Sequence, residues 1–236
     1  MSIWLFLWFI FAVILIGATA WSTIILIQQK KAWKAFAAKH NLTFIPGKFF
    51  APCEMQGSYK GYEVSFFTAE QQNPEERKNR QVTVFQLGVP KPFVDGVVMG
   101  SPNVKNFIDI LEGLSPHKIH SPVFRKEWIV VSRHEQAVDH YLTEERLKIL
   151  NGLLAFPKSD NLIILDGSEG AFRFETSNPL ADEQKLQTLT DKIIARVERL
   201  IPSEEEAKRL EAMVGENQKA DTPDESAAQS EAIKGK

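Results

Sequence analysis

The sequence predicts an α+β protein with one N-terminal transmembrane helix, then an antiparallel sheet packed by amphipathic helices, and a disordered acidic C-terminal tail. Three observations predict this order. From Ile3 to Ile27 the chain holds no Asp, Glu, Lys, Arg, His, Asn or Gln. Between residues 41 and 202, short alternating apolar patterns mix with stretches of helical period. Residues 203–236 carry nine acids against five bases and little apolar bulk. We therefore expect a membrane segment over 1–40, one soluble α+β domain over 41–202, and an acidic tail over 203–236.

The first apolar run is long enough to cross a bilayer. A helix that rises about 1.5 Å per residue needs about 20 apolar residues to span the hydrocarbon core, and this run has more. An Ala-Thr-Ala triplet at residues 18–20 offers an alternative, a signal peptide cleaved before Trp21. The run continues past that triplet, and no Lys or Arg precedes it. Because a signal peptide has a basic start and a shorter apolar core, we expect an uncleaved anchor whose helix continues to about Lys39.

The charges beside the run predict its orientation. Lys30, Lys31 and Lys34 follow it directly, and residues 1–53 contain no acid. Lys and Arg accumulate on the cytoplasmic side of membrane proteins. We therefore expect the N-terminus outside an inner (cell) membrane and the soluble domain in the cytoplasm, with the reverse topology as an alternative. Trp33 lies among these lysines and is predicted to anchor at the membrane interface.

The first half of the soluble domain has the pattern of strands. Lys60-Gly61 predicts a hairpin turn, since two-residue turns that contain Gly join antiparallel strands. A polar stretch that includes Asn-Pro predicts a loop over residues 70–80. The predicted strands cover residues 42–45, 54–59, 62–68 and 82–89, followed by an extended stretch over 93–99.

The second half alternates helices and strands. Pro102 predicts a helix start, and Thr143, followed by Glu144 and Glu145, predicts an N-cap. Asn178-Pro179 predicts the start of a helix that ends at Pro202. The predicted helices cover 102–114, 134–141, 143–157 and 178–202, the predicted strands cover 124–132, 162–165 and 171–175, and a connection covers 115–122. The two long helices have apolar stripes of Leu147, Leu150, Leu153 and Leu154, and of Leu186, Leu189, Ile193, Val197 and Leu200.

The acidic tail begins with a helical signal. Ser203 and Glu206 have the spacing of a capping box, which predicts a helix that ends at Gly215. From residue 216 the chain consists mainly of Ala, Gln, Ser, Glu and Lys. This composition predicts disorder, because it cannot bury enough apolar surface to fold.

Two segments of the domain resemble a bacterial family of membrane-anchored domains of unknown function. One is the run from Phe124 to Phe156, and the other is a Gly-x-Tyr-x-Gly segment in the first hairpin. The resemblance implies an anchored α+β domain across about residues 40–176, and it implies no catalytic residue. The matching residues are Phe124, Ile129, Val130, Ala137, Tyr141, Leu142, Thr143 and Leu147 in the first segment, and Gly57, Tyr59, Gly61 and Val64 in the second.

Four of the histidines are candidate metal ligands by residue type. His134 and His140 lie six residues apart, about 240° around a helix, so they do not face the same ion. His117 and His120 have a permissive spacing, but no carboxylate or thiolate lies near them in sequence. The Asp-Gly-Ser-Glu-Gly sequence at 166–170 is shorter than a calcium-binding loop and predicts a hairpin turn. We therefore expect no metal site.

The remaining chemistry is sparse. Cys53 is the only cysteine, which excludes an internal disulfide, and it is predicted to be a small buried residue. No phosphate-binding loop, dinucleotide fingerprint or nucleophile elbow occurs, so we expect no cofactor. The basic residues form no stripe with stacking aromatic residues, and we expect no nucleic-acid binding.

Two functions remain open at this point. The first is a single-pass membrane protein whose cytoplasmic domain has a non-catalytic binding or scaffolding role, with the lipid bilayer and an unknown protein as partners. The second is a membrane-anchored enzyme whose site is assembled from scattered His, Asp and Glu residues.

Overall fold

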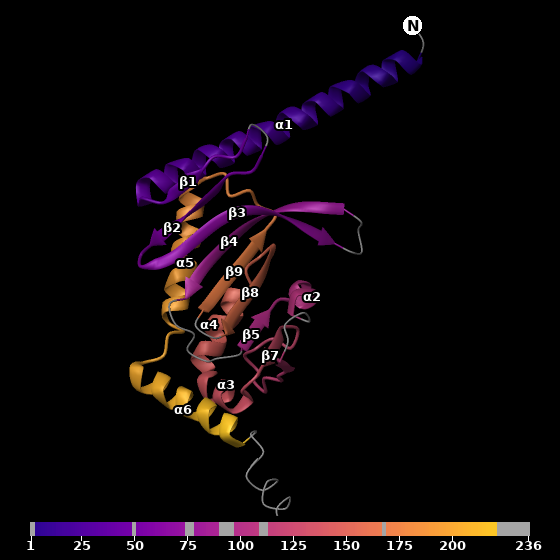
Figure 1. Ribbon diagram of the computed structural model, residues 1–236. Helices are drawn as coiled ribbons and strands as arrows, with labels where there is room; N and C mark the ends of the chain where they lie inside the picture. The colour runs from indigo at the N-terminus through magenta and orange to yellow at the C-terminus, as the bar shows by residue number, and fades with distance from the viewer. Residues whose placement is uncertain are drawn as a thin grey trace, which may run out of the picture.

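The computed structural model describes residues 3–48, 51–73, 78–89, 97–108, 113–166 and 169–220. Within them the fold is α+β, with a long helix at the N-terminus, one antiparallel sheet and helices packed on it (Figure 1). The helical elements are α1 (Ile3–His40), η1 (Pro102–Val104), α2 (Lys105–Ile108), α3 (Glu135–Tyr141), α4 (Glu144–Leu154), α5 (Glu183–Glu198) and α6 (Glu204–Ala220).

The described residues form nine strands in a single sheet, and every pair of neighbouring strands is antiparallel. The order across the sheet is β1-β2-β3-β4-β9-β8-β5-β7-β6. The strands are β1 (Thr43–Ile45), β2 (Glu54–Tyr59), β3 (Tyr62–Asn73), β4 (Lys78–Val89), β5 (Val97–Gly100), β6 (Ser115–Pro116), β7 (Ile129–Ser132), β8 (Ser159–Asp166) and β9 (Glu169–Thr176).

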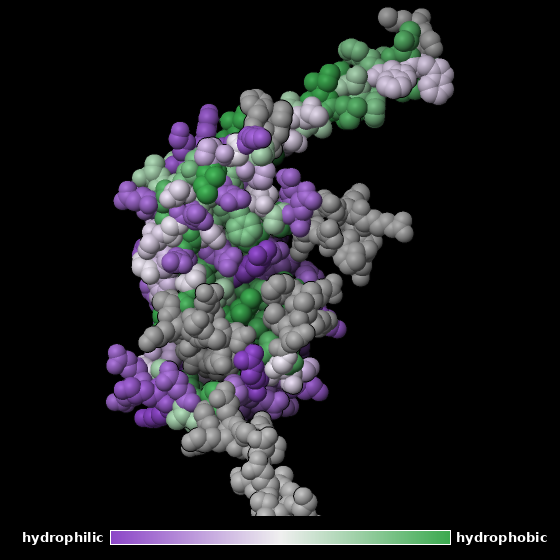
Figure 2. Space-filling view, viewed as in Figure 1, coloured by the Kyte–Doolittle hydropathy of each residue, from purple (hydrophilic) through white to green (hydrophobic). Residues whose placement is uncertain are grey.

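Helix α1 has an exposed apolar part and a part that is buried against the domain. Among the described helices, α1 is long and apolar enough to cross a membrane. Its apolar part projects away from the domain, and Figure 2 shows mainly hydrophobic residues on this projecting part. Its buried residues begin at Gln29 and include Trp33 and Phe36, both with no exposed surface. The predicted continuation of the helix beyond residue 27 is therefore confirmed.

The burial of Trp33 corrects one prediction. Its ring centroid lies 6.0 Å from that of Phe66 on β3, inside the main core. A fully buried ring is not available to the membrane interface, so the predicted anchoring role of Trp33 is wrong. The neighbouring Lys31 and Lys34 are exposed. Trp33 therefore joins α1 to the sheet.

Helices cover the two faces of the sheet unequally. The inner face carries the main core, whose aromatic centre includes the stacked rings of Phe66 and Phe85, 4.5 Å apart. Buried residues of α1, α3, α4, α5 and α6 belong to this core. The outer face is covered near β5, β7 and β8 by a smaller cluster that includes Ile108 and Val98. Among the described residues, no helix packs on the outer face of β1, β2, β3, β4 and the end of β9.

Polar contacts connect the end of α1 to the rest of the domain. Asp191 on α5 accepts hydrogen bonds from Tyr59 Oη and from Lys60 Nζ, both at 2.8 Å. Burial, together with the Asp191 contact, raises the pKa of Tyr59 to about 12. Lys39 Nζ donates to Gln187 at 2.8 Å. These contacts hold α1, the β2–β3 turn and α5 together.

Several predicted elements are confirmed with local detail. Lys60 and Gly61 have φ values of 52° and 83°, as a two-residue hairpin turn requires. Thr143 Oγ1 accepts a hydrogen bond from the Arg146 amide at 3.3 Å, which confirms the predicted N-cap. All four leucines of the α4 stripe are buried. Cys53 is buried, as expected.

The predicted loop over residues 70–80 is wrong in its described part. Strands β3 and β4 continue through it, with Ala69 paired with Val82 and Asn73 with Lys78. Residues 74–77 lie outside the described residues. The sequence suggested a loop because the stretch is polar, but pairing of the two backbones does not require apolar side chains.

Other boundaries also differ from prediction. The strand predicted over 124–132 is restricted to β7, and its edge pairs with β6 inside the predicted connection. Helix α5 begins at Glu183, since Asp182 accepts a hydrogen bond from the Lys185 amide at 3.0 Å, whereas Asn178 closes a turn onto Leu180. Only residues 102–108 of the helix predicted over 102–114 are described as helical, and 109–112 lie outside the described residues.

The start of the tail is helical and packed on the domain. Glu206 N donates to Ser203 Oγ at 3.3 Å, which confirms half of the capping box. The carboxylate of Glu206 instead binds Arg146 on α4, with Arg146 Nη2 at 2.7 Å. Helix α6 continues past Gly215 to Ala220, so the predicted end is wrong. Residues 221–236 lie outside the described residues.

Candidate functional site

The histidines singled out in the sequence do not converge. His134 is buried next to the start of α3, and its Nε2 atom has no hydrogen-bond partner among the described residues. His140 is exposed at the other end of that helix. The side chain of His117 is 6% exposed, and its Nε2 atom lies 2.9 Å from Asp139 Oδ1, a carboxylate that sequence spacing did not connect to it. His120 is exposed.

These groups do not make a metal centre in the part of the chain that the structure describes. There, no group of three or more His, Cys, Asp or Glu side chains is placed to hold an ion. His117 and Asp139 would supply two ligands, whereas structural zinc sites use four. Part of the turn at 166–170 lies outside the described residues, and its flanking strands β8 and β9 form the predicted hairpin.

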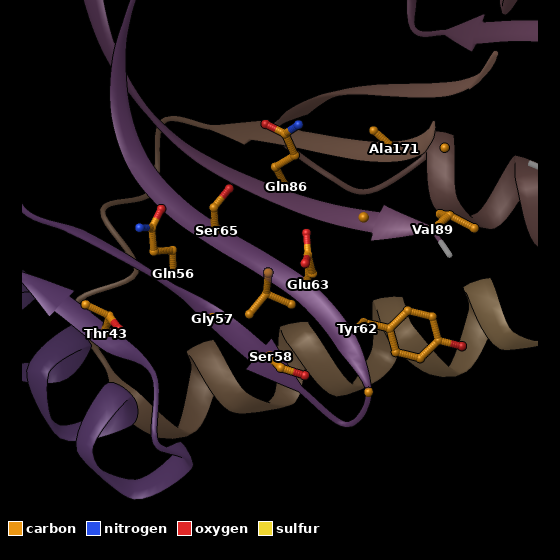
Figure 3. Close-up of a pocket in the computed structure, with 14 residues that line it drawn as sticks. Thr43, Gln56, Gly57, Ser58, Tyr62, Glu63, Ser65, Gln86, Val89 and Ala171 are labelled. Atoms are coloured by element: carbon orange, nitrogen blue, oxygen red, sulfur yellow. The ribbon is translucent and has the colours of Figure 1, made fainter. Parts of the chain in front are cut away.

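A groove of about 890 Å³ lies on the open outer face of the sheet (Figure 3). It is lined by Thr43, Gln56, Gly57, Ser58, Gly61, Tyr62, Glu63, Val64, Ser65, Gln86, Gly88, Val89, Gly170 and Ala171. These residues come from β1, β2, β3, β4, β9 and the β2–β3 turn. The groove therefore exists only when five strands from distant parts of the chain are paired.

Strand register arranges the groove in two rows that cross the strands. In the first row Thr43 pairs with Gln56, Gln56 with Ser65, and Ser65 with Gln86. Gln86 in turn pairs with Arg173, which lies next to the groove. Alternate residues of a strand point to opposite faces of the sheet. The residues next to the first row in the sequence, such as Met55 beside Gln56 and Phe66 beside Ser65, therefore point into the core. The first row is a line of amide and hydroxyl groups.

The second row contains small residues and forms the hollow. Ser58 pairs with Glu63, and Gly88 pairs with Ala171. A Cβ atom added at Gly88 would lie 3.4 Å from Glu63 Cβ, in ordinary contact. Gly88 and Ala171 leave the middle of the floor low because they have little or no side chain. Figure 3 shows the side chains of Glu63, Ser65 and Gln86 on the same face.

The groove has a mild electrostatic character. Glu63 is the exposed carboxylate among its lining residues, and Tyr62 stands at one end (Figure 3). Burial, with the nearby charge of Glu198, raises the pKa of Tyr62, so its hydroxyl stays protonated near neutral pH. Next to Gln86, Arg173 Nε donates to Glu175 at 2.6 Å, which neutralises both charges. Hydrogen-bonding groups therefore dominate over net charge.

Sequence reasoning did not find this groove. The period-two pattern predicts that Gln56, Ser65 and Gln86 point away from the core, so their orientation could be predicted from the sequence. The pattern cannot show that helices leave this part of the outer face open, or that Gly88 and Ala171 become neighbours.

Comparison of the chain with protein families, curated proteins and solved structures finds no match. The function is therefore inferred from the fold and the groove.

Proposed function

We propose that this chain is a single-pass membrane protein whose cytoplasmic α+β domain binds an extended segment of a partner protein in the outer-face groove. The observation that carries the proposal is the continuity of α1 from its apolar part into the core. Its first 25 residues are about 38 Å long at 1.5 Å per residue, which exceeds the ~30 Å hydrocarbon core. Since the same helix then supplies Trp33 and Phe36 to the core, no flexible linker separates membrane and domain.

The lysines beside the apolar part support a cytoplasmic domain. Lys31 and Lys34 are exposed on α1. Lys30 Nζ donates to the carbonyl of Lys48, at 3.1 Å, and so places a second lysine-bearing segment next to the helix. Positive charge of this kind favours the cytoplasmic side.

We expect a fluorescent protein fused at the C-terminus to fluoresce and an alkaline phosphatase fused there to be inactive, because the first folds in the cytoplasm and the second needs the outside. The charge variant K31E/K34E should shift a fraction of molecules to the opposite topology. Active phosphatase with no fluorescence in the unmodified chain would overturn the orientation.

The chemistry of the groove favours a peptide segment. Gln56 and Gln86 offer both amide donors and carbonyl acceptors, and Ser65 offers a hydroxyl that does both. An extended backbone presents the complementary N–H and C=O groups at regular intervals. Five strands about 4.8 Å apart make the groove about 19 Å long, which matches five to six extended residues. The open shape suits a chain that enters and leaves at the ends.

We predict that G88V weakens partner binding about tenfold, because a side chain at position 88 fills the low middle of the floor at a cost of 1–3 kcal/mol. Valine suits a strand, and the space above Gly88 tolerates its Cβ, so the fold should persist. The measurement is crosslinking in cells from a photoreactive residue at Ser65 in the full-length protein.

The matched control is T188A, on the exposed side of α5, a helix that packs on the core face of the sheet, opposite to the groove. Its crosslinking yield should equal that of the unmodified chain. Equal crosslinking yields from G88V and T188A would exclude the groove as the binding site, provided that both variants unfold at the same temperature as the unmodified chain.

A further inference from the structure

Glu63 differs from the other residues that line the groove because it carries a charge. It is the exposed carboxylate among them, and it lies on β3 between Ser58 on β2 and Gly88 on β4. Figure 3 shows its carboxylate on the same side of the sheet as Ser65 and Gln86. Within the part of the chain that the structure describes, this carboxylate makes no hydrogen bond or ion pair. Both of its oxygens are therefore open to a ligand.

Two described bases near this part of the groove already bind other acids. Lys60, in the β2–β3 turn, has its Nζ atom 2.8 Å from Asp191 Oδ1 on α5. Arg173, on β9, donates to Glu175 at 2.6 Å. These bases therefore do not compensate the negative charge of Glu63. Because charges attract each other more strongly where part of the surrounding water is excluded, the groove beside Glu63 favours a cation.

The floor beside Glu63 leaves room for a side chain of the ligand. Gly88 has no side chain, and its register partner Ala171 has only a methyl group. Next in the same row, Ala171 pairs with Ile164 on β8, which is half-buried. Glu63 and Ile164 are three strands apart, about 14 Å, and the low part of the floor lies between them. A side chain with an apolar stem and a charged end suits a space between an apolar residue and a carboxylate.

Hydroxyl groups flank the carboxylate of Glu63. Ser58 is its register partner, and Ser65 lies two residues further along β3 on the same face. A Lys ammonium has three N–H donors, an Arg guanidinium has five, and neither has an acceptor. The carboxylate and the two hydroxyls supply acceptors for these donors, and hydrogen bonds between charged groups are short and strong. The chemistry beside Glu63 therefore matches a basic side chain.

We propose that the partner segment in the groove carries a Lys or Arg side chain whose cation binds Glu63 above the floor formed by Gly88 and Ala171. This inference rests on the proposed binding of a partner segment, and it adds the chemical class of that segment. Glu63 determines specificity in this arrangement, because it attracts basic segments and repels acidic ones. The apolar stem of the bound side chain covers the floor between Glu63 and Ile164.

The test uses the full-length protein in nanodiscs to select ligands from a bacteriophage-displayed library of random hexapeptides. The selection is repeated with E63Q, with E63K, and with G88V, which fills the floor of the groove. The matched control is E211K, which reverses the charge of an exposed carboxylate on α6, outside the groove. Because Glu63 is exposed, its substitutions should leave the unfolding temperature unchanged, which circular dichroism measures.

We expect the peptides selected by the unmodified chain and by E211K to be enriched in Lys and Arg at one position, about fivefold over the library. E63Q should select peptides without this enrichment, and E63K should select Asp or Glu at that position instead. For one selected peptide, fluorescence anisotropy should show that E63Q weakens binding about fivefold. Replacing the basic residue of that peptide by Gln should weaken binding to the unmodified chain equally but leave binding to E63Q unchanged, because the pair is already lost.

The outcomes separate this inference from the function on which it rests. If the unmodified chain selects no peptides beyond those selected by G88V, the groove does not bind an extended segment, and both proposals are overturned. If it selects peptides without a basic residue, or if E63Q and E63K keep the same enrichment in Lys and Arg, only the contact with Glu63 is overturned.

Discussion

The substitution W33A will lower the free energy of unfolding of the domain by about 3–5 kcal/mol, the range for removal of a fully buried tryptophan. Trp33 has no exposed surface, and it packs against Phe66 on the central part of the sheet. Its loss leaves a cavity at the point where α1 meets the sheet. Because the free energy of unfolding of a domain is only about 5–15 kcal/mol, this single change removes a large part of the stability of the domain. Urea unfolding of the detergent-solubilised full chain, followed by circular dichroism, measures it.

The matched control for W33A is W21A. Trp21 lies on the same helix with 67% of its surface exposed, on the part that projects from the domain. W21A should change the unfolding free energy by less than about 0.5 kcal/mol, as exposed positions do. If the two variants have the same urea midpoint, Trp33 does not join the anchor to the core.

The substitution R146M will lower the unfolding free energy by about 2–4 kcal/mol, because it removes one partner of a half-buried, bidentate ion pair. Arg146 Nη1 and Nη2 donate to the two carboxylate oxygens of Glu206 at 2.5 and 2.7 Å, and Nη1 also donates to the Tyr141 carbonyl at 3.0 Å. Methionine keeps an unbranched apolar stem and removes the guanidinium, whose Cζ atom lies 4.5 Å from the centre of the Tyr141 ring. The pair holds α6 on α4, so proteolysis between α5 and α6 should also become faster.

The pH dependence of stability distinguishes the ion pair from simple packing. Hydrogen bonds from the Arg146 guanidinium are the main reason that the pKa of Glu206 lies below its ordinary value of 4.5. A carboxylate with a lowered pKa in the folded state stabilises the fold fully above 4.5, and this stabilisation disappears as the pH falls through the folded-state pKa. The unmodified chain should therefore be more stable than E206Q at pH 7, and the two should converge in acid. If the unmodified chain and E206Q gave parallel curves of unfolding free energy against pH, the ion pair between Arg146 and Glu206 would not stabilise the fold.

Local chemistry explains the features that the sequence predicted well. The turn at Lys60-Gly61, the cap at Thr143 and the leucine stripe of α4 depend on residues within about four positions of one another. Backbone strain, capping geometry and helical period act at that range. The same range explains why α1 could be followed in the sequence beyond residue 27, through good helix formers.

Distant partners explain the features that the sequence predicted poorly. Glu206 has the spacing to complete a capping box with Ser203, but Arg146, sixty residues earlier, offers two charged hydrogen bonds and takes its carboxylate. Residues 70–73 and 78–80 are as polar as a loop, yet they continue β3 and β4, whose backbones pair with each other there. His117 meets Asp139 across 22 residues. None of these contacts follows from spacing along the chain.

The groove is the clearest case of partial prediction. Alternation along β2, β3 and β4 assigns Gln56, Ser65 and Gln86 to the face away from the core. Whether that face is covered depends on where the helices and loops pack. The hollow itself depends on Gly88 lying beside Ala171, which is decided by the pairing of β4 with β9.

By itself, the sequence determined that this protein has an apolar segment able to span a membrane, a helix that continues beyond it, and an α+β domain, because composition and period are properties of neighbouring residues. Only the tertiary structure decided that Trp33 belongs to the core rather than to the membrane interface, and that part of one sheet face stays open as a groove. Burial is the physical reason. The surroundings of a side chain are set by elements far away in the chain, and those elements become neighbours only when the sheet has formed.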